Sequence, residues 1–136
     1  MRVPGILIAA PASGSGKTAA ACALMAAFTK RGMTVRACKC GPDYIDPMFH
    51  REVLGMDSRN LDLFFSSKEE LKKGYEEHLS GADLAVTEGV MGYYDGMSMD
   101  SDTASSYDVS WTLGLPVILV LPCRGASLSL AAVIKG

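Results

Sequence analysis

The first residues with recognisable chemistry form a short run of small side chains that ends in lysine and threonine: Ser13, Gly14, Ser15, Gly16, Lys17 and Thr18. The two glycines allow backbone conformations that a side chain would forbid, so that consecutive N–H groups can converge on phosphate oxygens. The Lys17 ammonium can reach the terminal phosphates of a nucleotide, and the Thr18 hydroxyl can bind Mg²⁺. The run therefore predicts a loop that binds ATP together with Mg²⁺.

The run departs at one position from the phosphate-loop pattern G-x-x-x-x-G-K-[ST], because Pro11 occupies the place of the first glycine. The alternative is a Ser/Gly turn that merely precedes a helix. The remaining pattern, and its place between a predicted strand and a predicted helix, favour the phosphate loop.

Three acidic residues, Asp43, Asp46 and Glu88, are candidates for metal binding and for catalysis, with Thr18 as a further metal ligand. Glu88 ends one predicted strand, and Asp43 and Asp46 follow another. The carboxyl ends of parallel strands meet at the edge of the sheet where ligands bind. Oxygen atoms are the ligands that Mg²⁺ prefers. We therefore expect these carboxylates to converge close to Lys17.

Each carboxylate also has a purely structural alternative. Asp43 follows Gly-Pro and could stabilise a turn. Asp46 could cap a helix that has Pro47 at its first position. Glu88, which stands before Gly89 at the end of a strand, is the hardest to explain in this way.

The elements that must position these residues alternate between strands and helices. We expect strands at Val3–Ala9, Thr34–Cys38, Asp83–Glu88 and Pro116–Leu121. We expect helices at Lys17–Arg31 (closed by Gly32), around Met48–Leu54, from Ser67 to about Leu79, at Thr103–Leu113, and beginning at Ser127–Lys135. Ser67 and Glu70 form a capping-box pattern. The alternation predicts an α/β fold in which helices cover both faces of a parallel sheet, and four strands without a final one suggest a truncated domain.

Composition and charge exclude several classes of protein. Hydrophobic residues make up 49% and charged residues 21% of the chain, and the net charge of −2 argues against a nucleic-acid-binding surface. No stretch approaches the roughly 20 apolar residues of a membrane helix. Arg2 and the segment Val3–Ala12 imitate a signal peptide, but Pro4 and Gly5 interrupt the apolar run. We expect a cytoplasmic protein without nucleic-acid or membrane partners.

The four cysteines lack the spacing of a disulfide scaffold. Cys38 and Cys40 alternate along a predicted strand, so both can face the same side. Zinc at this pair would need two more ligands, and His50 and His78 follow no zinc-finger spacing. We expect Cys38 and Cys40 to be buried thiols.

The run Lys39–His50, which reads KCGPDYIDPMFH, resembles the signature of cobyrinic acid a,c-diamide synthases, the glutamine-dependent amidotransferases of cobalamin biosynthesis. Further stretches match this family in the same order: Ala10–Thr18, Ser58–Asp62, Glu88–Gly96 and Leu115–Val120. The resemblance covers essentially the whole chain and implies a P-loop NTPase domain of the dethiobiotin-synthetase-like type. The phosphate loop alone would not separate this family from dethiobiotin synthetases or partitioning ATPases.

The resemblance implies a stepwise reaction. ATP phosphorylates the a or c carboxylate of a corrin precursor, and ammonia released from glutamine then displaces phosphate to leave an amide. By the family motif, Asp43, Asp46 and Glu88 are metal-binding or catalytic acids. Lys39 is a second partner of phosphate or carboxylate in the catalytic set, with a solvated lysine at a strand end as the alternative.

Several other residues in the matching motifs have open roles. The resemblance places Tyr44, His50, Arg59 and Asn60 where they could contact the large anionic substrate. His50 could equally be a helix residue with its hydrogen bonds satisfied, and Tyr44 a packing residue. Asp95 could order its glycine-rich loop or assist at the metal.

The family's synthetases also carry a C-terminal glutaminase domain, and Cys123 lacks the glycine pattern around such a nucleophile. We therefore expect residues 1–136 to be the N-terminal part of the synthetase domain, without the glutaminase domain that would be its partner. A homodimer is a further expectation.

The alternatives are a nickel-sirohydrochlorin a,c-diamide synthase with similar motifs, a partitioning or metal-carrier ATPase, and a non-catalytic nucleotide-binding fragment. Ala12 disfavours the ATPase, since such ATPases often have lysine there.

Overall fold

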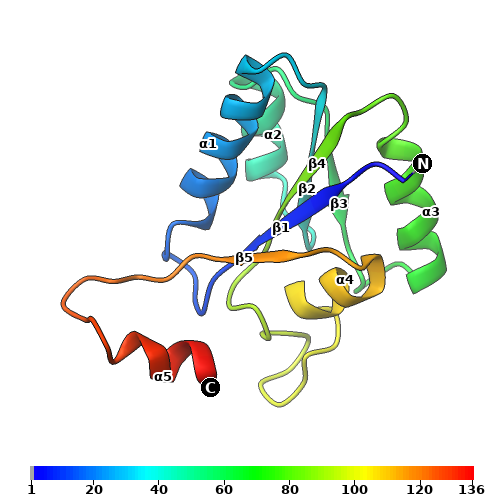
Figure 1. Cartoon of the computed structure of the whole chain (residues 1–136). Helices are drawn as coiled ribbons and strands as arrows, with labels where there is room; N and C mark the ends of the chain where they lie inside the picture. Colours follow the sequence, from blue (N-terminus) through cyan, green and yellow to red (C-terminus); the bar gives the residue numbers. More distant parts are fainter. Residues whose placement is uncertain (1) are drawn as a thin grey trace.

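Five parallel strands form the central sheet of the computed structural model, which describes residues 2–136 (Figure 1). They are β1 (Gly5–Ala9), β2 (Val35–Cys40), β3 (Ser58–Leu61), β4 (Leu84–Glu88) and β5 (Val117–Leu119). Their order across the sheet is β3-β2-β4-β1-β5, and every neighbouring pair is parallel. The predicted parallel α/β architecture is confirmed.

Helices cover both faces of this sheet, as predicted (Figure 1). They are α1 (Lys17–Lys30), α2 (Ile45–Glu52), α3 (Lys68–His78), α4 (Ser106–Leu113) and α5 (Leu130–Lys135). On one face, Met25 of α1 packs in a core cluster with Ile8 and Val86. Helix α2 packs against β2 and β3. On the other face, Tyr75 of α3 shares a cluster with Leu7 and with residues of α4. The short helix α5 lies away from the sheet.

Alternation along β2 decides which side chains reach the α1 face. Val35 and Ala37 pack in the core cluster on that side, whereas Cys38 and Cys40 pack in the cluster with α3 and α4. Both cysteines are fully buried free thiols, as predicted. Lys39 continues the series of Val35 and Ala37, because successive side chains of a strand point to opposite faces. A charged residue thus takes a core position at the carboxyl end of β2.

Strand β3 was not predicted, so the expectation of four strands was wrong. Ser58–Leu61 is short and mostly polar, which gives it little of the apolar pattern by which strands are recognised. It forms the edge of the sheet and pairs with β2, from Ala37 opposite Ser58 to Cys40 opposite Leu61. Backbone pairing therefore makes a strand where side-chain pattern gives no signal.

Helix α2 begins at Ile45 rather than near Met48. Pro47 is tolerated because the N–H groups of a first helical turn have no partner within the helix. The Asp43 carboxylate accepts hydrogen bonds from the backbone N–H groups of Ile45, at 2.8 Å, and Asp46, at 3.4 Å. The capping role considered for Asp46 is therefore wrong, and the turn-stabilising role of Asp43 is confirmed.

Other element boundaries differ only slightly from expectation. Helix α1 ends at Lys30, and Gly32 follows it with φ of +85°, in the left-handed region that closes helices. Helix α4 begins at Ser106 rather than Thr103, since the Ser105 side chain caps it by accepting a hydrogen bond from the Asp108 N–H. Within residues 2–136 no helix has the length and apolar character needed to cross a membrane.

The predicted capping box of α3 is confirmed and gives a test of the fold. The Ser67 hydroxyl accepts a hydrogen bond from the Glu70 N–H at 3.2 Å, and the Glu70 carboxylate accepts one from the Ser67 N–H at 2.8 Å. Ser67→Ala removes the first of these bonds, so it should lower the free energy of unfolding by about 1 kcal/mol in denaturant titrations. Ser80→Ala, at an exposed position just after α3, is the control and should change it little. Equal stability of the two variants would contradict the role of the cap.

Candidate functional site

The phosphate loop joins β1 to α1 and borders a pocket of about 460 Å³. Gly14 and Gly16 have φ of +75° and +101°, in the left-handed region that residues with side chains rarely adopt. The residues that line the pocket come from the phosphate loop, α1, β2, β4 and the loops after these strands: Ser13, Gly14, Gly16, Lys17, Thr18, Ala19, Lys39, Asp43, Glu88, Val90 and Met91. The loop and three of the four residues predicted to be catalytic thus face one pocket.

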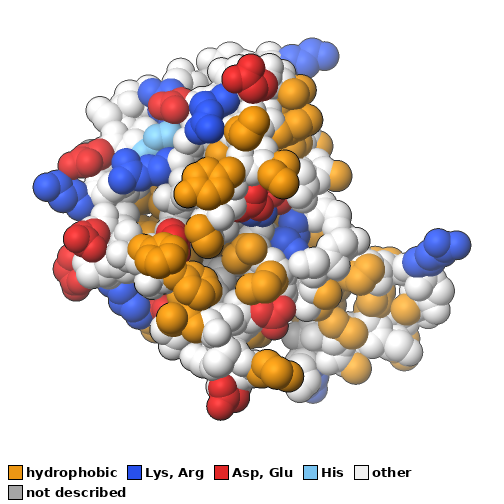
Figure 2. Space-filling view, turned by 180° about the vertical axis from the view of Figure 1, so that it is seen from behind, with side chains coloured by type: hydrophobic (Ala, Val, Ile, Leu, Met, Phe, Trp, Pro, Cys, Tyr) orange, Lys and Arg blue, Asp and Glu red, His pale blue; other side chains and the backbone are white. Residues whose placement is uncertain are grey.

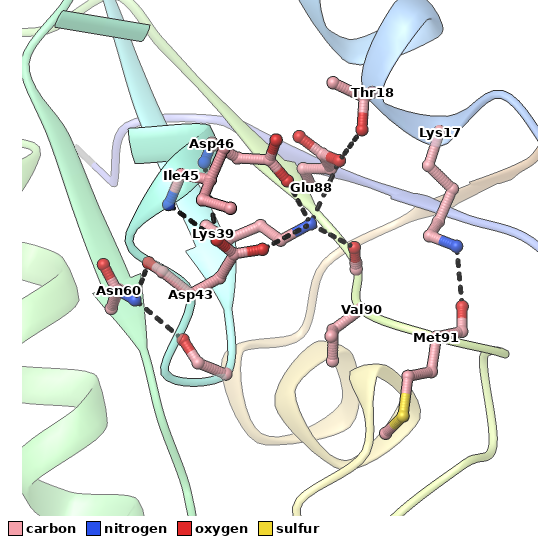
Figure 3. A network of polar contacts seen from close by, with 12 residues as sticks. Lys17, Thr18, Lys39, Asp43, Ile45, Asp46, Asn60, Glu88, Val90 and Met91 are labelled. Atoms are coloured by element: carbon pink, nitrogen blue, oxygen red, sulfur yellow. Dashed lines mark hydrogen bonds and ion pairs between the residues drawn. The ribbon is translucent and has the colours of Figure 1, made fainter. Parts of the chain in front are cut away.

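The three candidate carboxylates converge on the ammonium of Lys39 (Figure 3). Lys39 Nζ lies 2.8 Å from Asp46 Oδ2, 3.0 Å from Glu88 Oε1 and 3.8 Å from Asp43 Oδ2. It also donates a hydrogen bond to the Gly89 carbonyl at 3.1 Å. Lys39 is only 4% exposed, so the alternative of a solvated lysine is wrong. The acidic residues lie together as expected, with a lysine between them.

The sheet itself positions Lys39 against Glu88. The two residues are direct partners in the parallel register of β2 and β4, one step beyond Cys38 and Thr87. Glu88 follows Leu84 and Val86 on the α1 side of β4, as Lys39 follows apolar residues on the same side of β2. Both side chains therefore project from the carboxyl ends of neighbouring strands toward the phosphate loop.

Burial and pairing act in opposite directions on these charged groups. Burial alone would raise the pKa of Glu88, but the nearby His50 ring, the Lys39 ammonium and the Thr18 hydroxyl together lower that pKa to about 2. Burial would lower the pKa of Lys39, and hydrogen bonds to Asp46 and Glu88 more than offset this and raise it. Both groups are therefore charged at neutral pH despite their burial.

Thr18 and Lys17 connect α1 to the ends of the strands. The Thr18 hydroxyl donates a hydrogen bond to Glu88 Oε1 at 2.5 Å. The Lys17 ammonium donates to the Met91 carbonyl at 2.7 Å (Figure 3). It also donates to the Ala12 carbonyl at 3.2 Å. Burial, and then the positive charge of Lys39, lower the pKa of Lys17. Met91 has φ of +50°, which is uncommon for a residue with a side chain, so Lys17 holds a strained stretch of backbone.

His50 lies next to Glu88 and is completely buried, so of its two open roles the structure disfavours contact with a substrate. Its Nδ1 is 3.0 Å from the Ser58 hydroxyl, and its Nε2 is 3.7 Å from Glu88 Oε2. Neither His50 Nε2 nor Glu88 Oε2 has a hydrogen-bond partner among the described residues. His50 stands four residues after Asp46 on α2, and this spacing places both on one side of the helix. That spacing is the signal by which sequence reasoning could have joined His50 to the site.

Asn60 positions the loop that carries Asp43. Its side-chain amide donates hydrogen bonds to the carbonyls of Gly41, at 2.9 Å, and of Asp43. The resemblance left its role open, with contact to the substrate as one possibility, and strand β3, which carries it, was not predicted. Asn60 therefore acts on the site through the backbone of the loop after β2.

The remaining motif residues lie outside the charged cluster. Tyr44 is 78% exposed, so the alternative of a packing residue is wrong. Arg59 is exposed and its guanidinium lies against Gly74 of α3, on the side of the sheet away from α1. The Asp95 carboxylate accepts a hydrogen bond from the Gly92 N–H at 2.8 Å, which orders the loop after β4.

The donor atoms at the pocket fit a magnesium ion that also binds phosphate, and do not fit an ion held by the protein alone. Within residues 2–136 no three side chains of His, Cys, Asp or Glu are arranged to hold a metal among them. The Thr18 hydroxyl and the Glu88 carboxylate nevertheless meet at the pocket, and Glu88 has one oxygen without a partner in that part of the chain. Mg²⁺ typically takes one or two protein oxygens and completes its octahedron with phosphate and water.

Comparisons with known proteins show which family the chain resembles. Residues 6–124 match the family model of the CobQ/CobB/MinD/ParA nucleotide binding domain, CbiA. The chain is 48% identical over 131 residues to a cobyrinate a,c-diamide synthase of Gloeobacter violaceus. The aligned residues make up 96% of this chain and 29% of the relative. It is 46% identical over 134 residues to a hydrogenobyrinate a,c-diamide synthase of Streptomyces coelicolor. Here the aligned residues make up 98% of this chain and 28% of the relative.

A cobyrinate a,c-diamide synthase of Picrophilus torridus is 42% identical over 136 residues, which are 31% of its own length. The chain thus spans less than a third of the length of these curated relatives. The resemblance to a,c-diamide synthases that the motifs indicated is confirmed by relatives that match almost the whole chain. With the family model matched from β1 to beyond β5, the chain belongs to the CobQ/CobB/MinD/ParA family of nucleotide-binding domains.

Proposed function

We propose that this domain performs the ATP-dependent activation step of an a,c-diamide synthase that acts on a corrinoid. The observation that carries the proposal is the buried ammonium of Lys39, held among three carboxylates at the edge of the phosphate pocket. The names of the relatives supply the substrate class, since they are cobyrinate and hydrogenobyrinate a,c-diamide synthases. Ser13–Thr18 would bind ATP.

The proposed reaction has two steps. A carboxylate oxygen of the substrate attacks the γ-phosphorus of ATP, and ADP leaves, so that an acyl phosphate forms. Ammonia then attacks the acyl carbon, and inorganic phosphate leaves with the electrons of the broken C–O bond to give the amide. The carboxylate alone is a poor electrophile, so the first step supplies its leaving group. Catalysis consists mainly of positioning the reactants and neutralising their charge.

Two lysines would share this work. Lys17 now donates to backbone carbonyls, which are weaker partners than the phosphate oxygens that would replace them. Lys39 lines the same pocket as Asp43 and Glu88, and its ammonium already contacts Asp46, Glu88 and the Gly89 carbonyl. A substrate carboxylate would replace one of these partners next to the γ-phosphate, since an ammonium has three N–H donors. Because burial makes charge interactions stronger than in water, each ammonium would favour the close approach of two anions.

The carboxylates would serve the metal and the lysines. Mg²⁺, when bound with ATP, would reduce the negative charge on the phosphates, with Thr18 and Glu88 as its protein ligands and Asp43 and Asp46 beside them. Three carboxylates and the ammonium groups of Lys17 and Lys39 leave one net negative charge in the cluster. That excess suits a site that receives a divalent cation.

The ammonia would come from glutamine through a glutaminase domain elsewhere in the full-length protein, with residues 1–136 as the N-terminal part of its synthetase domain. We propose a cytoplasmic enzyme, without nucleic-acid or membrane partners, that could function as a homodimer. A nickel-sirohydrochlorin substrate presents the same carboxylate chemistry. Parallel assays of the full-length protein with cobyrinate and with nickel sirohydrochlorin would distinguish the two substrates.

Lys17→Ala tests the nucleotide site. Loss of a charge-assisted contact worth up to about 3 kcal/mol should weaken ATP binding in the presence of Mg²⁺ by about 100-fold in isothermal titration. Lys30→Ala is the matched control, since Lys30 is exposed at the far end of the same helix. Unchanged affinity in Lys17→Ala would remove the phosphate loop from the proposal.

Glu88→Gln separates nucleotide binding from chemistry. The amide keeps the size of the side chain but removes its negative charge, so ATP affinity should stay within about threefold while magnesium-dependent acyl-phosphate formation falls by about 100-fold. The full-length protein, cobyrinate, ATP and Mg²⁺ would be incubated with hydroxylamine, and the trapped hydroxamate measured. Glu69→Gln, on the exposed side of α3, is the control. Hydroxamate at the wild-type rate in Glu88→Gln would exclude this carboxylate from the reaction.

Lys39→Met tests the charge coupling inside the cluster. Without the ammonium 3.0 Å away, burial dominates and the pKa of Glu88 should rise above its present value of about 2. The carboxyl ¹³C shift of Glu88, identified by its absence in Glu88→Gln, would then titrate at higher pH. Lys68→Met, which breaks the more exposed ion pair of Lys68 with Asp108, should leave this titration unchanged. A Glu88 titration unaffected by Lys39→Met would contradict the coupling.

A further inference from the structure

Exposed apolar side chains lie on two segments that flank the phosphate pocket. We define the apolar rim as six of them, contributed by α2, the residue before it, and the loop after β4: Tyr44, Ile45, Met48, Met91, Met97 and Met99. The first three are 78%, 78% and 55% exposed, and the three methionines of the loop are between 40% and 107% exposed. Side chains of this size are seldom gathered in the open without a partner.

The rim has two sides with the charged cluster between them. In Figure 3, Ile45 and Met91 lie on opposite sides of the contact between Lys39 and Glu88. Figure 2 shows hydrophobic side chains gathered around a small group of acidic and basic ones on this face of the molecule. The rim therefore frames the reactive centre.

A second pocket continues from the phosphate pocket on the side of the loop after β4. Its volume is about 950 Å³, and Met91 lines both pockets. Met97 and Met99 contribute apolar surface to the larger pocket, while Asp95, Asp100 and Asp102 contribute negative charge. A volume near 1,000 Å³ is at the upper end of pockets that hold small molecules, so the pocket has room for a large one.

We propose that the apolar rim binds the flat face of a corrinoid macrocycle while one carboxylate at the edge of the macrocycle reaches Lys39. This inference rests on the proposed function and adds the surface that holds the substrate. The macrocycle is a broad apolar plate with carboxylates around its edge. The rim offers broad apolar surface, and its centre offers an ammonium, so the two are complementary in both respects.

The acidic wall of the larger pocket gives direction to this binding. Carboxylates at the edge of the macrocycle would be repelled by Asp95, Asp100 and Asp102, because like charges at short range disfavour each other. At the other end of the rim, the phosphate pocket holds the ammonium groups of Lys39 and Lys17, with which a carboxylate can pair. A carboxylate of the plate is thus better placed at the phosphate pocket than at the acidic wall.

The composition of the rim suits a substrate that must bind in two orientations. The a and c carboxylates stand at different places on the macrocycle, so each requires its own placement over the same reactive centre. Met48, Met91, Met97 and Met99 supply unbranched, polarizable side chains that adapt to differently placed surfaces. A rigid, sharply fitted pocket would favour only one of the two reactions.

Substitutions on both sides of the rim test the proposal in the full-length protein. Ile45→Ser and Met97→Ser each remove apolar contact area, so KM for cobyrinate should rise by about 10-fold in each and further in the double variant. The value of kcat and KM for ATP should stay within about twofold, since neither side chain lines the phosphate pocket. Trp111→Ser is the matched control, because Trp111 is 75% exposed on α4 and lines neither the phosphate pocket nor the larger pocket.

Binding measured without turnover gives the second readout. Titration of the variants into cobyrinate, followed by the visible absorbance of the macrocycle with a non-hydrolysable ATP analogue present, should show the same loss of affinity. Unchanged KM and Kd in the double variant of an active enzyme would overturn the rim proposal alone. A wild-type protein that forms no hydroxamate with cobyrinate would overturn the proposed function, and the rim proposal with it.

Two other occupants of the rim would be revealed by the same variants. If a second copy of the chain covers it, the double variant should sediment as a smaller species with unchanged affinity for cobyrinate. If another segment of the polypeptide covers it, the double variant should melt several degrees lower, again with unchanged affinity. Either result would overturn the proposal.

Discussion

The contact between Lys39 and the carboxylates of Asp46 and Glu88 is the interaction on which the site depends. It joins three parts of the fold: the ends of β2 and β4, which the sheet sets side by side, and α2, which follows β2. A buried charge is tolerated only when it is paired and hydrogen-bonded, because its removal from water is costly. Each of these groups thus fixes the others, and the loop between β2 and α2 has little freedom to move away from the sheet.

A second set of contacts ties this cluster to the phosphate loop. Thr18 reaches Glu88 directly, and the loop after β4 returns over the start of the phosphate loop, where the Tyr93 N–H donates to the Ala10 carbonyl at 2.8 Å. Pro11 occupies the position at which the usual pattern has its first glycine, so flexibility is reduced at that point. The two loops pack closely at Gly92, where an added Cβ atom would lie 2.6 Å from the Pro11 carbonyl oxygen. A glycine on the neighbouring loop therefore provides the space.

Sequence predicted the strands, helices and loops that carry a strong local signal. Strand β1, the phosphate loop and helix α1 follow from an apolar run, glycines and a helix-forming segment, and Glu88 follows from its place at the end of an apolar strand. Strand β3 could not be predicted in this way, since its residues become a strand only through backbone pairing with β2. The roles of His50 and Asn60 stayed open for the same reason. Each acts through tertiary contacts, one next to Glu88 and the other on the backbone around Asp43, that no local pattern encodes.

The hydrogen bond from Lys17 to the Met91 carbonyl has a consequence for the order in which ligands bind. Met91 stands in a strained backbone conformation, and its side chain belongs to the wall shared by the two pockets. A triphosphate that captured the Lys17 ammonium would leave this carbonyl without its donor, and the segment would be free to relax. Nucleotide arrival would then reshape the surface next to it before a second reactant settles there. A hydrogen bond that the nucleotide must break in this way would produce compulsory-order kinetics, in which the nucleotide binds first.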